Sequence, residues 1–133
     1  MNKYQWLDEY LRGQKGCAKD YKAEWGWWRY RVGGKMFAAV CLPGPEHGIY
    51  GGRELVTLKC EPMLGELLRA EYPDILPGFY ADKRCWISVF LAGEVPDELL
   101  RDLCGSSYRL VFKGLTKKLQ REIEAGLQAP GSI

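Results

Sequence analysis

The feature that most constrains the fold is a pair of adjacent glycines, Gly33 and Gly34, between two runs rich in β-branched and aromatic residues. The runs are residues 28–32 (WRYRV) and 35–40 (KMFAAV). Two glycines at this position favour a type I′ turn, because both central residues of that turn take positive φ angles. The sequence therefore predicts a β-hairpin, in which the two strands are antiparallel.

A two-residue turn also predicts which hairpin side chains share a face of the sheet. One face is expected to be core, with Lys35 near its rim, and carries the cross-strand pairs Val32–Lys35, Tyr30–Phe37 and Trp28–Ala39. The opposite face is expected to place two cations beside a tryptophan and comprises Trp27, Arg29, Arg31, Met36, Ala38 and Val40.

Hydrophobic periodicity, glycines and prolines predict the remaining elements. Strands are expected at 54–60 and 86–91, and residues 75–80 read as a turn or loop. Helices are expected from an Asn2 cap to about residue 14, from Pro62 to Tyr72, from Pro96 onward, and at 117–127 after a break at Gly114 or Thr116. Because strands and helices do not alternate regularly, the pattern favours a single α+β domain over residues 1–128, with an antiparallel sheet backed by helices on one face. Residues 129–133 are expected to fray.

The composition excludes several classes of protein. The chain has 133 residues, 47% of them hydrophobic, which is the ordinary globular value. Its five cysteines form no C-x-x-C pair, so we expect reduced, mostly buried thiols and no zinc site. The single histidine, His47, lies in a loop rich in proline and glycine, and the common nucleotide-binding and hydrolase motifs are absent. With no signal-like or membrane-spanning segment, the expectation is a cytoplasmic protein, not an enzyme, without metal or cofactor.

The charges are segregated along the chain, although their total is only +2. Residues 10–41 hold seven cations and two acids, residues 109–121 hold five cations and no acid, and residues 54–102 hold ten acids and five cations. If the hairpin and the last helices meet, they form one positive surface that could hold phosphates. The predicted nucleic-acid contacts, with Trp27 as a stacking partner, are Arg29, Arg31, Lys35, Lys83, Arg84, Lys113, Lys117, Lys118 and Trp27.

An ordered set of short segments resembles the MmcQ/YjbR family of small bacterial proteins. The set runs from about residue 3 to residue 120 and consists of VGGKMF (32–37), LKC (58–60), PGFY (77–80) with Lys83 and Trp86, and SSYRLV (106–111). The resemblance implies a fold similar to frataxin (CyaY-like), also described as a double-wing arrangement. Members are described as DNA-binding, a label that rests mainly on fold analogy.

The resemblance also marks one departure and one exclusion. Family members commonly have histidine where this chain has Tyr80, so a phenol replaces whatever that histidine does. The frataxin-like fold also suggests iron binding, which would need an acidic ridge on the first helix. That helix has only two acidic residues, Asp8 and Glu9.

Three functions follow as alternatives. The first is a monomeric binding module that contacts nucleic-acid backbone without sequence preference through its cations. The second is a protein-interaction module that uses an exposed sheet face or edge strand. The third is a small-molecule enzyme or sensor built around Tyr80, His47 and a cysteine, which would require a pocket where these three converge. Ser107 is expected to be a packing residue bonded back along its helix rather than a nucleophile.

Overall fold

The structure, a computed structural model, describes residues 4–126. The predicted cap Asn2, the end of the last predicted helix and the predicted frayed tail at 129–133 lie outside these residues. In chain order the elements are α1 (Tyr4–Arg12), β1 (Cys17–Lys22), β2 (Trp27–Val32), β3 (Lys35–Cys41), the 3-10 helix η1 (Pro45–Tyr50), β4 (Leu55–Lys59), α2 (Pro62–Glu71), β5 (Ile75–Pro77), β6 (Trp86–Phe90), α3 (Asp97–Lys113) and α4 (Lys117–Glu124).

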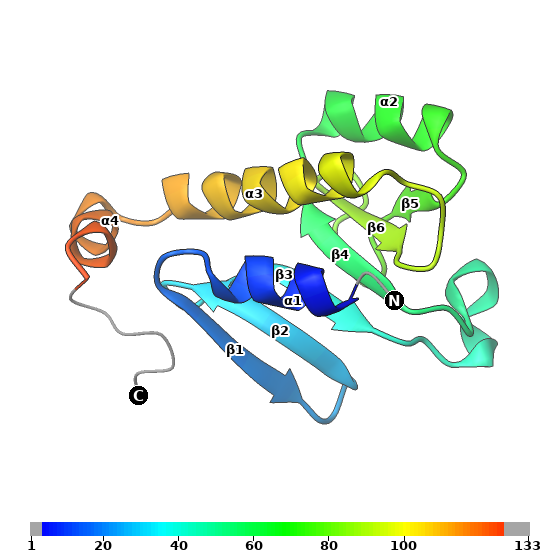
Figure 1. Ribbon diagram of the computed structural model, residues 1–133, viewed down its shortest axis with the longest axis horizontal. Coiled ribbons are helices and arrows are strands. Elements are labelled where there is room, and N and C mark those ends of the chain that lie inside the picture. The colour runs from blue at the N-terminus through cyan, green and yellow to red at the C-terminus, as the bar shows by residue number, and fades with distance from the viewer. Residues whose placement is uncertain (1–3, 127–133) are drawn as a thin grey trace.

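The strands form one six-stranded sheet in the order β1-β2-β3-β4-β6-β5, and every neighbouring pair is antiparallel. Helices α1 and α3 lie along the same face of this sheet, α2 packs beside β5 and β6, and α4 follows the end of α3 (Figure 1). The α+β class with helices on one face, predicted from the hairpin and the irregular order of elements, is confirmed.

The predicted hairpin is present, but its register changes after the first two pairs. Gly33 and Gly34 both have positive φ, and Val32 pairs with Lys35 as expected. The register then shifts at a β-bulge, so that Tyr30 pairs with Ala38 and Phe37 is the extra residue. The predicted pairs Tyr30–Phe37 and Trp28–Ala39 are therefore wrong.

The bulge redistributes the side chains of β3 between the two faces. Ala38 and Val40, predicted for the far face, join the main core, and Ala39 joins the opposite cluster. An inserted residue moves every later side chain to the other face, since strand side chains alternate. Trp28, predicted as core, is 42% exposed, and the Lys19 ammonium lies 4.7 Å from its ring centroid.

Ser107 of α3 satisfies the backbone groups beside the bulge. Its hydroxyl donates to the Phe37 carbonyl at 2.5 Å and accepts from the Lys59 amide at 2.8 Å. The β3–β4 ladder runs only from the Ala38–Leu58 pair onward, so neither group has its ordinary strand partner. Ser107 is fully buried, as a packing residue would be, but it bonds across to two strands and not back along its own helix.

Two buried clusters lie on opposite faces of the sheet. The larger contains side chains of all four helices, among them Leu7, Leu68, Leu100 and Ile123. The smaller contains no helix residue and forms under loops on the helix-free face, from Trp27, Ala39, Cys41, Leu55, Phe79 and Phe90. The helix-free face is therefore a second packed surface, partly open to solvent.

Two edge strands were not expected. β1 was missed because three of its six residues are charged, which a central strand would not tolerate but an edge strand does. β5, read as turn or loop, has three residues and ends in Pro77, a residue that edge strands accept because it has no N–H to donate.

All five cysteines are free thiols, and all but Cys85 are buried, as predicted.

Asp8 of α1 accepts hydrogen bonds from three donors, two of which, Lys19 of β1 and Tyr30 of β2, link the helix to the sheet. Its carboxylate accepts from the Tyr30 hydroxyl at 2.6 Å, from Lys19 at 2.7 Å and from Arg12 at 2.9 Å. Partial burial raises the pKa of Asp8, but the three hydrogen bonds outweigh it and hold that pKa below its ordinary value of 3.8.

Within residues 4–126, no helix combines the length and apolar composition that a membrane crossing needs.

The two turn glycines give the first test of the fold. A Cβ at Gly33 would lie 2.7 Å from Leu115 and 2.9 Å from Leu119, whereas a Cβ at Gly34 would meet nothing within 4 Å. Both have positive φ, so Gly34→Ala should cost about 1 kcal/mol from backbone strain alone. Gly33→Ala should cost roughly 2–4 kcal/mol, because the clash with two side chains is added. Equal free energies of unfolding for the two variants, measured by urea denaturation, would contradict the close approach.

Asp8→Asn gives the second test, through the pH dependence of stability. The pKa of Asp8 is lower in the folded chain than in the unfolded chain. The stability that the carboxylate contributes is therefore fully present above the unfolded-state pKa and is lost as pH falls through the folded-state pKa. At neutral pH we expect Asp8→Asn to lower the free energy of unfolding by about 1–3 kcal/mol. The gap between wild type and variant should narrow below pH 3.8, in denaturation series at several pH values. A gap that stays constant to strong acid would show that the carboxylate charge does not stabilise the fold.

Candidate functional site

The two basic segments of the chain meet in space. The turn at Gly33 lies against the side chains of Leu115 and Leu119, at the junction of α3 and α4. Gly16, just before β1, approaches Ile123 of α4 in the same way. The sequence made a shared positive surface conditional on the hairpin and the last helices meeting, and they meet here, at the end of the molecule where Figure 1 shows α4.

A groove of about 320 Å³ runs along this end, where β3 begins and β4 ends. It is lined by Lys35 and Lys59, by the half-buried Trp86, by Leu110 and Val111 of α3 and by Gly114, which follows α3. Lys59 and Trp86 are cross-strand partners, so the cation and the indole lie on the same face of the sheet. Lys59 was not among the predicted contacts, because a lysine at a strand end carries no distinguishing sequence signal.

Three further predicted contacts flank this groove. Lys113 ends α3, immediately before Gly114, and Lys117 and Lys118 begin α4. All three are exposed, and none has a side-chain ion pair with any residue from 4 to 126. Lys35 is also exposed and Lys59 is half-buried, and neither has a side-chain ion pair with any residue from 4 to 126. We call these five residues the basic end: Lys35, Lys59, Lys113, Lys117 and Lys118.

Arg29 and Arg31 do not belong to the basic end, because Asp20 of the edge strand engages both. Arg29 donates to the two carboxylate oxygens of Asp20 at 2.9 and 2.7 Å, and Arg31 donates to one of them at 3.0 Å. The Arg29 hydrogen bonds are the main cause that lowers the pKa of Asp20, so the carboxylate stays charged. Asp20 therefore partly neutralises the predicted positive face. The sequence did not predict β1, the strand that carries Asp20.

The other predicted contacts also have different surroundings. Trp27 is 6% exposed and packs in the cluster on the helix-free face, so its ring is not free to stack on a base. Lys83 donates to the Gly78 carbonyl at 2.8 Å and so holds a loop. Arg84 is open to solvent and lies 3.8 Å from Asp82. None of these three lines the groove at the basic end.

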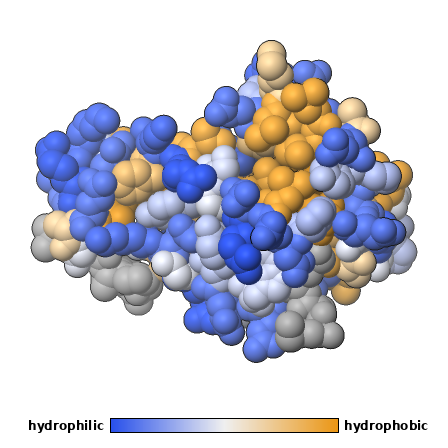
Figure 2. Space-filling view, turned by 45° about the horizontal axis from the view of Figure 1, so that its top comes forward, coloured by the Kyte–Doolittle hydropathy of each residue, from blue (hydrophilic) through white to orange (hydrophobic). Residues whose placement is uncertain are grey.

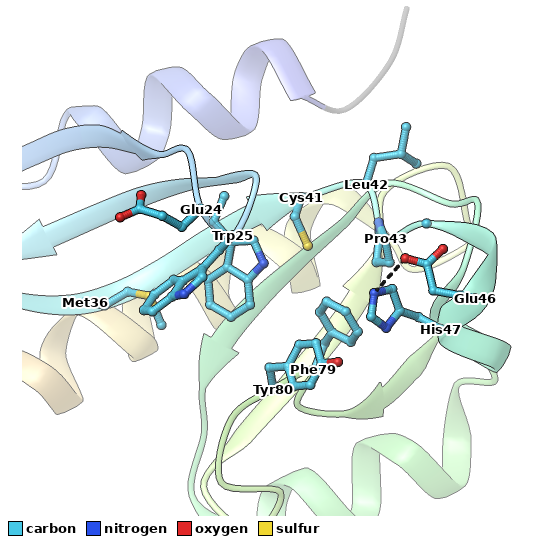
Figure 3. Close-up of a pocket in the computed structure, with 12 residues that line it drawn as sticks. Glu24, Trp25, Met36, Cys41, Leu42, Pro43, Glu46, His47, Phe79 and Tyr80 are labelled. Atoms are coloured by element: carbon cyan, nitrogen blue, oxygen red, sulfur yellow. Dashed lines mark ion pairs between the residues drawn. The ribbon is translucent and has the colours of Figure 1, made fainter.

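A second and larger pocket, about 690 Å³, opens on the helix-free face. Figure 3 shows Trp25 on one side of it, His47, Phe79 and Tyr80 on the other, and the Cys41 thiol between them. The walls come from three segments that are far apart in sequence: the β1–β2 turn, the η1 loop and the loop after β5. Sequence reasoning proposed Tyr80, His47 and a cysteine as a third possibility but had no sign that they converge, and the structure brings them together.

Hydrogen bonds hold the aromatic wall of this pocket in place. The Phe79 amide donates to the Ser88 hydroxyl at 2.9 Å, and that hydroxyl shares a hydrogen bond of 2.7 Å with Thr57. The Tyr50 hydroxyl donates to the Pro77 carbonyl at 2.7 Å. The loop that carries Phe79 and Tyr80 is thus attached to two central strands and to η1, so the wall is preformed.

Tyr80 is the one residue other than glycine with a positive φ, 51°, among residues 4–126. The left-handed region strains a residue with a Cβ, and such strain is concentrated at binding sites. Its ring is 72% exposed and lies 4.7 Å from the Phe79 ring and 5.5 Å from the His47 ring, centroid to centroid. Tyr80, the position that the family resemblance marked as a departure, is therefore at the rim of this pocket.

The pocket is poorly suited to nucleophilic chemistry. Burial raises the pKa of the Cys41 thiol to about 12, with the Glu54 charge as a smaller cause, so the sulfur is protonated at neutral pH. His47 faces the Glu46 carboxylate at 3.4 Å and stacks edge-on against Phe79 and Tyr80. Within residues 4–126, no group of three or more acidic, histidine or cysteine side chains could hold a metal ion.

Apolar side chains are also exposed on α2. Met63, Leu64 and Leu67 are 76%, 41% and 64% exposed, whereas Leu68 of the same helix is buried. Figure 2 shows one patch of apolar side chains at the upper right of the face in view, bordered by hydrophilic side chains, and hydrophilic side chains over most of the left, where α4 lies.

Comparison with known proteins gives a consistent result. A family model described as YjbR matches residues 13–110. The Escherichia coli O157:H7 protein YbdF is 35% identical over 97 residues, which are 73% of this chain and 74% of YbdF. YjbR of Escherichia coli K12 is 29% identical over 103 residues, 77% of this chain and 81% of YjbR.

Solved structures agree with these sequence matches. The crystal structure of the Deinococcus radiodurans protein DR2400 superposes with a TM-score of 0.78 at 29% identity, covering 100% of this chain and 93% of that one. A Pseudomonas syringae protein superposes with a TM-score of 0.68 at 26% identity, covering 83% of this chain and 98% of that one. None of these names states an activity or a ligand, so function has to be argued from the geometry above.

The strained position of Tyr80 gives a test of the pocket wall. Asparagine adopts the left-handed conformation with less strain than tyrosine, and the exposed ring buries little surface. We therefore expect Tyr80→Asn to change the free energy of unfolding by no more than about 0.5 kcal/mol in the destabilising direction. The neighbouring Phe79→Ala should cost about 3–5 kcal/mol, because that ring is buried. If thermal denaturation shows Tyr80→Asn to be as harmful as Phe79→Ala, the Tyr80 ring is part of the core.

Proposed function

The chain belongs to the YjbR family, and we propose that this member is a monomeric, non-enzymatic binding module whose basic end holds the phosphate backbone of a nucleic acid. The observation that carries the proposal is the contact of the Gly33 turn with Leu115 and Leu119. That contact brings the lysine of one basic segment to the lysines of the other. The proposal is also supported by the lack of any ion pair between these lysines and a carboxylate of residues 4–126.

The chemistry of the basic end favours backbone contacts over base recognition. Lysine ammonium groups are flexible point charges that suit phosphate oxygens, whereas base edges are read by planar, bidentate groups. The two arginines of the hairpin, Arg29 and Arg31, are engaged by Asp20. Binding through such lysines is expected to be indifferent to sequence and to weaken steeply with salt.

Trp86 takes the role that the sequence reading gave to Trp27. It lines the groove at the basic end together with Lys35 and Lys59, and it is the cross-strand partner of Lys59. An indole beside phosphate-binding cations can stack on an unpaired base, a contact worth about 1–3 kcal/mol per base in single-strand binding proteins. We therefore expect single strands to bind more tightly than duplexes of the same length.

The test is a fluorescence anisotropy titration of labelled oligonucleotides with the full chain. Two unrelated sequences should bind equally at low salt, and the logarithm of affinity should fall with the logarithm of salt with a slope of about −2 to −4, for three to five phosphate contacts. The double variant Lys35→Glu/Lys117→Glu should weaken binding by about tenfold or more at low salt.

The matched control is Arg53→Gln. It removes one positive charge at the opposite end of β4, where Arg53 pairs with Asp74 at 3.1 Å. With both variants also compared at about 0.1 M salt, where the Debye length is about 10 Å, this variant should leave affinity within about twofold of wild type, because Arg53 lies beyond the end of β4 that is far from Lys59. No association with either strand form at low salt, or equal losses in the two variants, would refute the proposal.

A protein-interaction module is the second candidate, and one observation favours it. Met63, Leu64 and Leu67 expose an apolar strip on α2, away from the basic end. Exposed apolar patches of this kind often mark contacts between proteins. Oligonucleotide binding that survives Met63→Glu and Leu67→Glu would separate the two functions.

A further inference from the structure

The pocket on the helix-free face carries an inference beyond the proposed backbone binding. It is separate from the basic end, and only Met36 lines both hollows. Its volume of about 690 Å³ is in the usual range for sites that hold small organic molecules. The wall is preformed by the hydrogen bonds from Phe79 and Tyr50, and Tyr80, whose backbone is in the left-handed region, lines the pocket beside them.

The lining has a definite chemical character. Aromatic rings approach from both sides: Trp25 and Trp27 meet at 5.2 Å between centroids, and Trp27 lies 6.3 Å from Phe79. The charged side chains in the lining are the carboxylates of Glu24 and Glu46, and the twelve residues drawn in Figure 3 include no lysine or arginine. The lining therefore offers no lysine or arginine to an anionic ligand.

Aromatic faces and carboxylates both attract positive charge. Of the three aromatic side chains, tryptophan binds cations most strongly, through its π face. Aromatic cages of this composition recognise alkylated ammonium groups. The Trp25 ring already has cations near it, with Lys22 at 5.2 Å and Arg29 at 5.8 Å from its centroid. Neither lines the pocket, and each is paired with a carboxylate, Lys22 with Glu24 and Arg29 with Asp20.

We propose that this pocket binds an organic cation with an alkylated ammonium group, which lies against Trp25, Phe79 and Tyr80 and is attracted by Glu24 and Glu46 at the rim. The protonated Cys41 thiol at the base of the pocket contributes an apolar surface and no reaction. The pocket therefore binds its ligand without chemical change.

The experiment is an NMR titration of the full ¹⁵N-labelled chain, read at the side-chain N–H signals of its five tryptophans. Choline and benzyltrimethylammonium are the cationic probes, and the matched control ligand is the uncharged isostere of choline, in which carbon replaces the ammonium nitrogen. We expect both cations to move the signals of Trp25 and Trp27 and to leave those of Trp6 and Trp28 unchanged. The isostere should bind about tenfold more weakly, or not detectably, because it lacks the charge that the rings attract.

Three variants and one control locate the site. Trp25→Ala and Tyr80→Asn should each weaken choline binding by roughly three- to tenfold, and Glu46→Gln by about twofold. Trp28→Ala removes the other exposed tryptophan of the same hairpin, which does not line the pocket, and should leave affinity unchanged. All of these side chains are exposed, so the variants should fold.

Two results would overturn the inference. If the uncharged isostere binds as tightly as choline, the pocket takes apolar molecules and the charge is irrelevant. If neither cation moves the Trp25 and Trp27 signals, the pocket is not a site for organic cations. Both results are independent of the oligonucleotide titration, because the lysines of that test lie outside this pocket.

Discussion

The close approach of Gly33 to Leu115 and Leu119 is the contact on which the arrangement of the basic residues depends. A Cβ at Gly33 would lie within 3 Å of both leucines, so only glycine allows the turn to lie so close to the junction of α3 and α4. This packing is apolar, yet its consequence is electrostatic. It gathers lysines from residues 35 to 118 at one end of the sheet, and repulsion among them is tolerated because their ammonium groups extend into solvent.

The β-bulge at Phe37 has a comparable effect on the two faces of the sheet. By adding one residue, it directs Ala38 and Val40 into the helix-side core and leaves Ala39 and Cys41 on the helix-free face. The backbone groups beside the bulge would be unsatisfied without the hydroxyl of Ser107, which bridges β3 and β4 from α3. One serine thus connects the main helix with the strands that line both the groove and the aromatic pocket.

Much of the fold follows from local signals in the sequence. The Gly33–Gly34 turn, the antiparallel sheet with helices on one face and the central strands are all predictable from periodicity and turn residues. The bulge is not, because a one-residue insertion depends on how α3 packs over the sheet, which is a tertiary effect. β1 is not either, since Lys19, Asp20 and Lys22 hide its alternation, and missing it concealed the carboxylate that engages Arg29 and Arg31.

The candidate sites show the same limit. Segregated charge along the chain predicted a basic end, and Lys35, Lys113, Lys117 and Lys118 lie there. The aromatic pocket could not be predicted, because Trp25, His47 and Tyr80 come from three loops whose convergence only the completed sheet determines. The family resemblance marked Tyr80 as a difference from the family pattern, and in the structure Tyr80 lies at the rim of the pocket.

The most direct measurement of the central claim is an amide chemical-shift map of the full ¹⁵N-labelled chain with a short single-stranded oligonucleotide at low salt. If the packing of Gly33 against α3 and α4 creates the binding surface, the largest changes will fall at Lys35, Lys59 and residues 113–118, and will disappear as salt is raised. Changes centred on Arg29, Arg31 and β1, or spread evenly over the surface, would contradict the account.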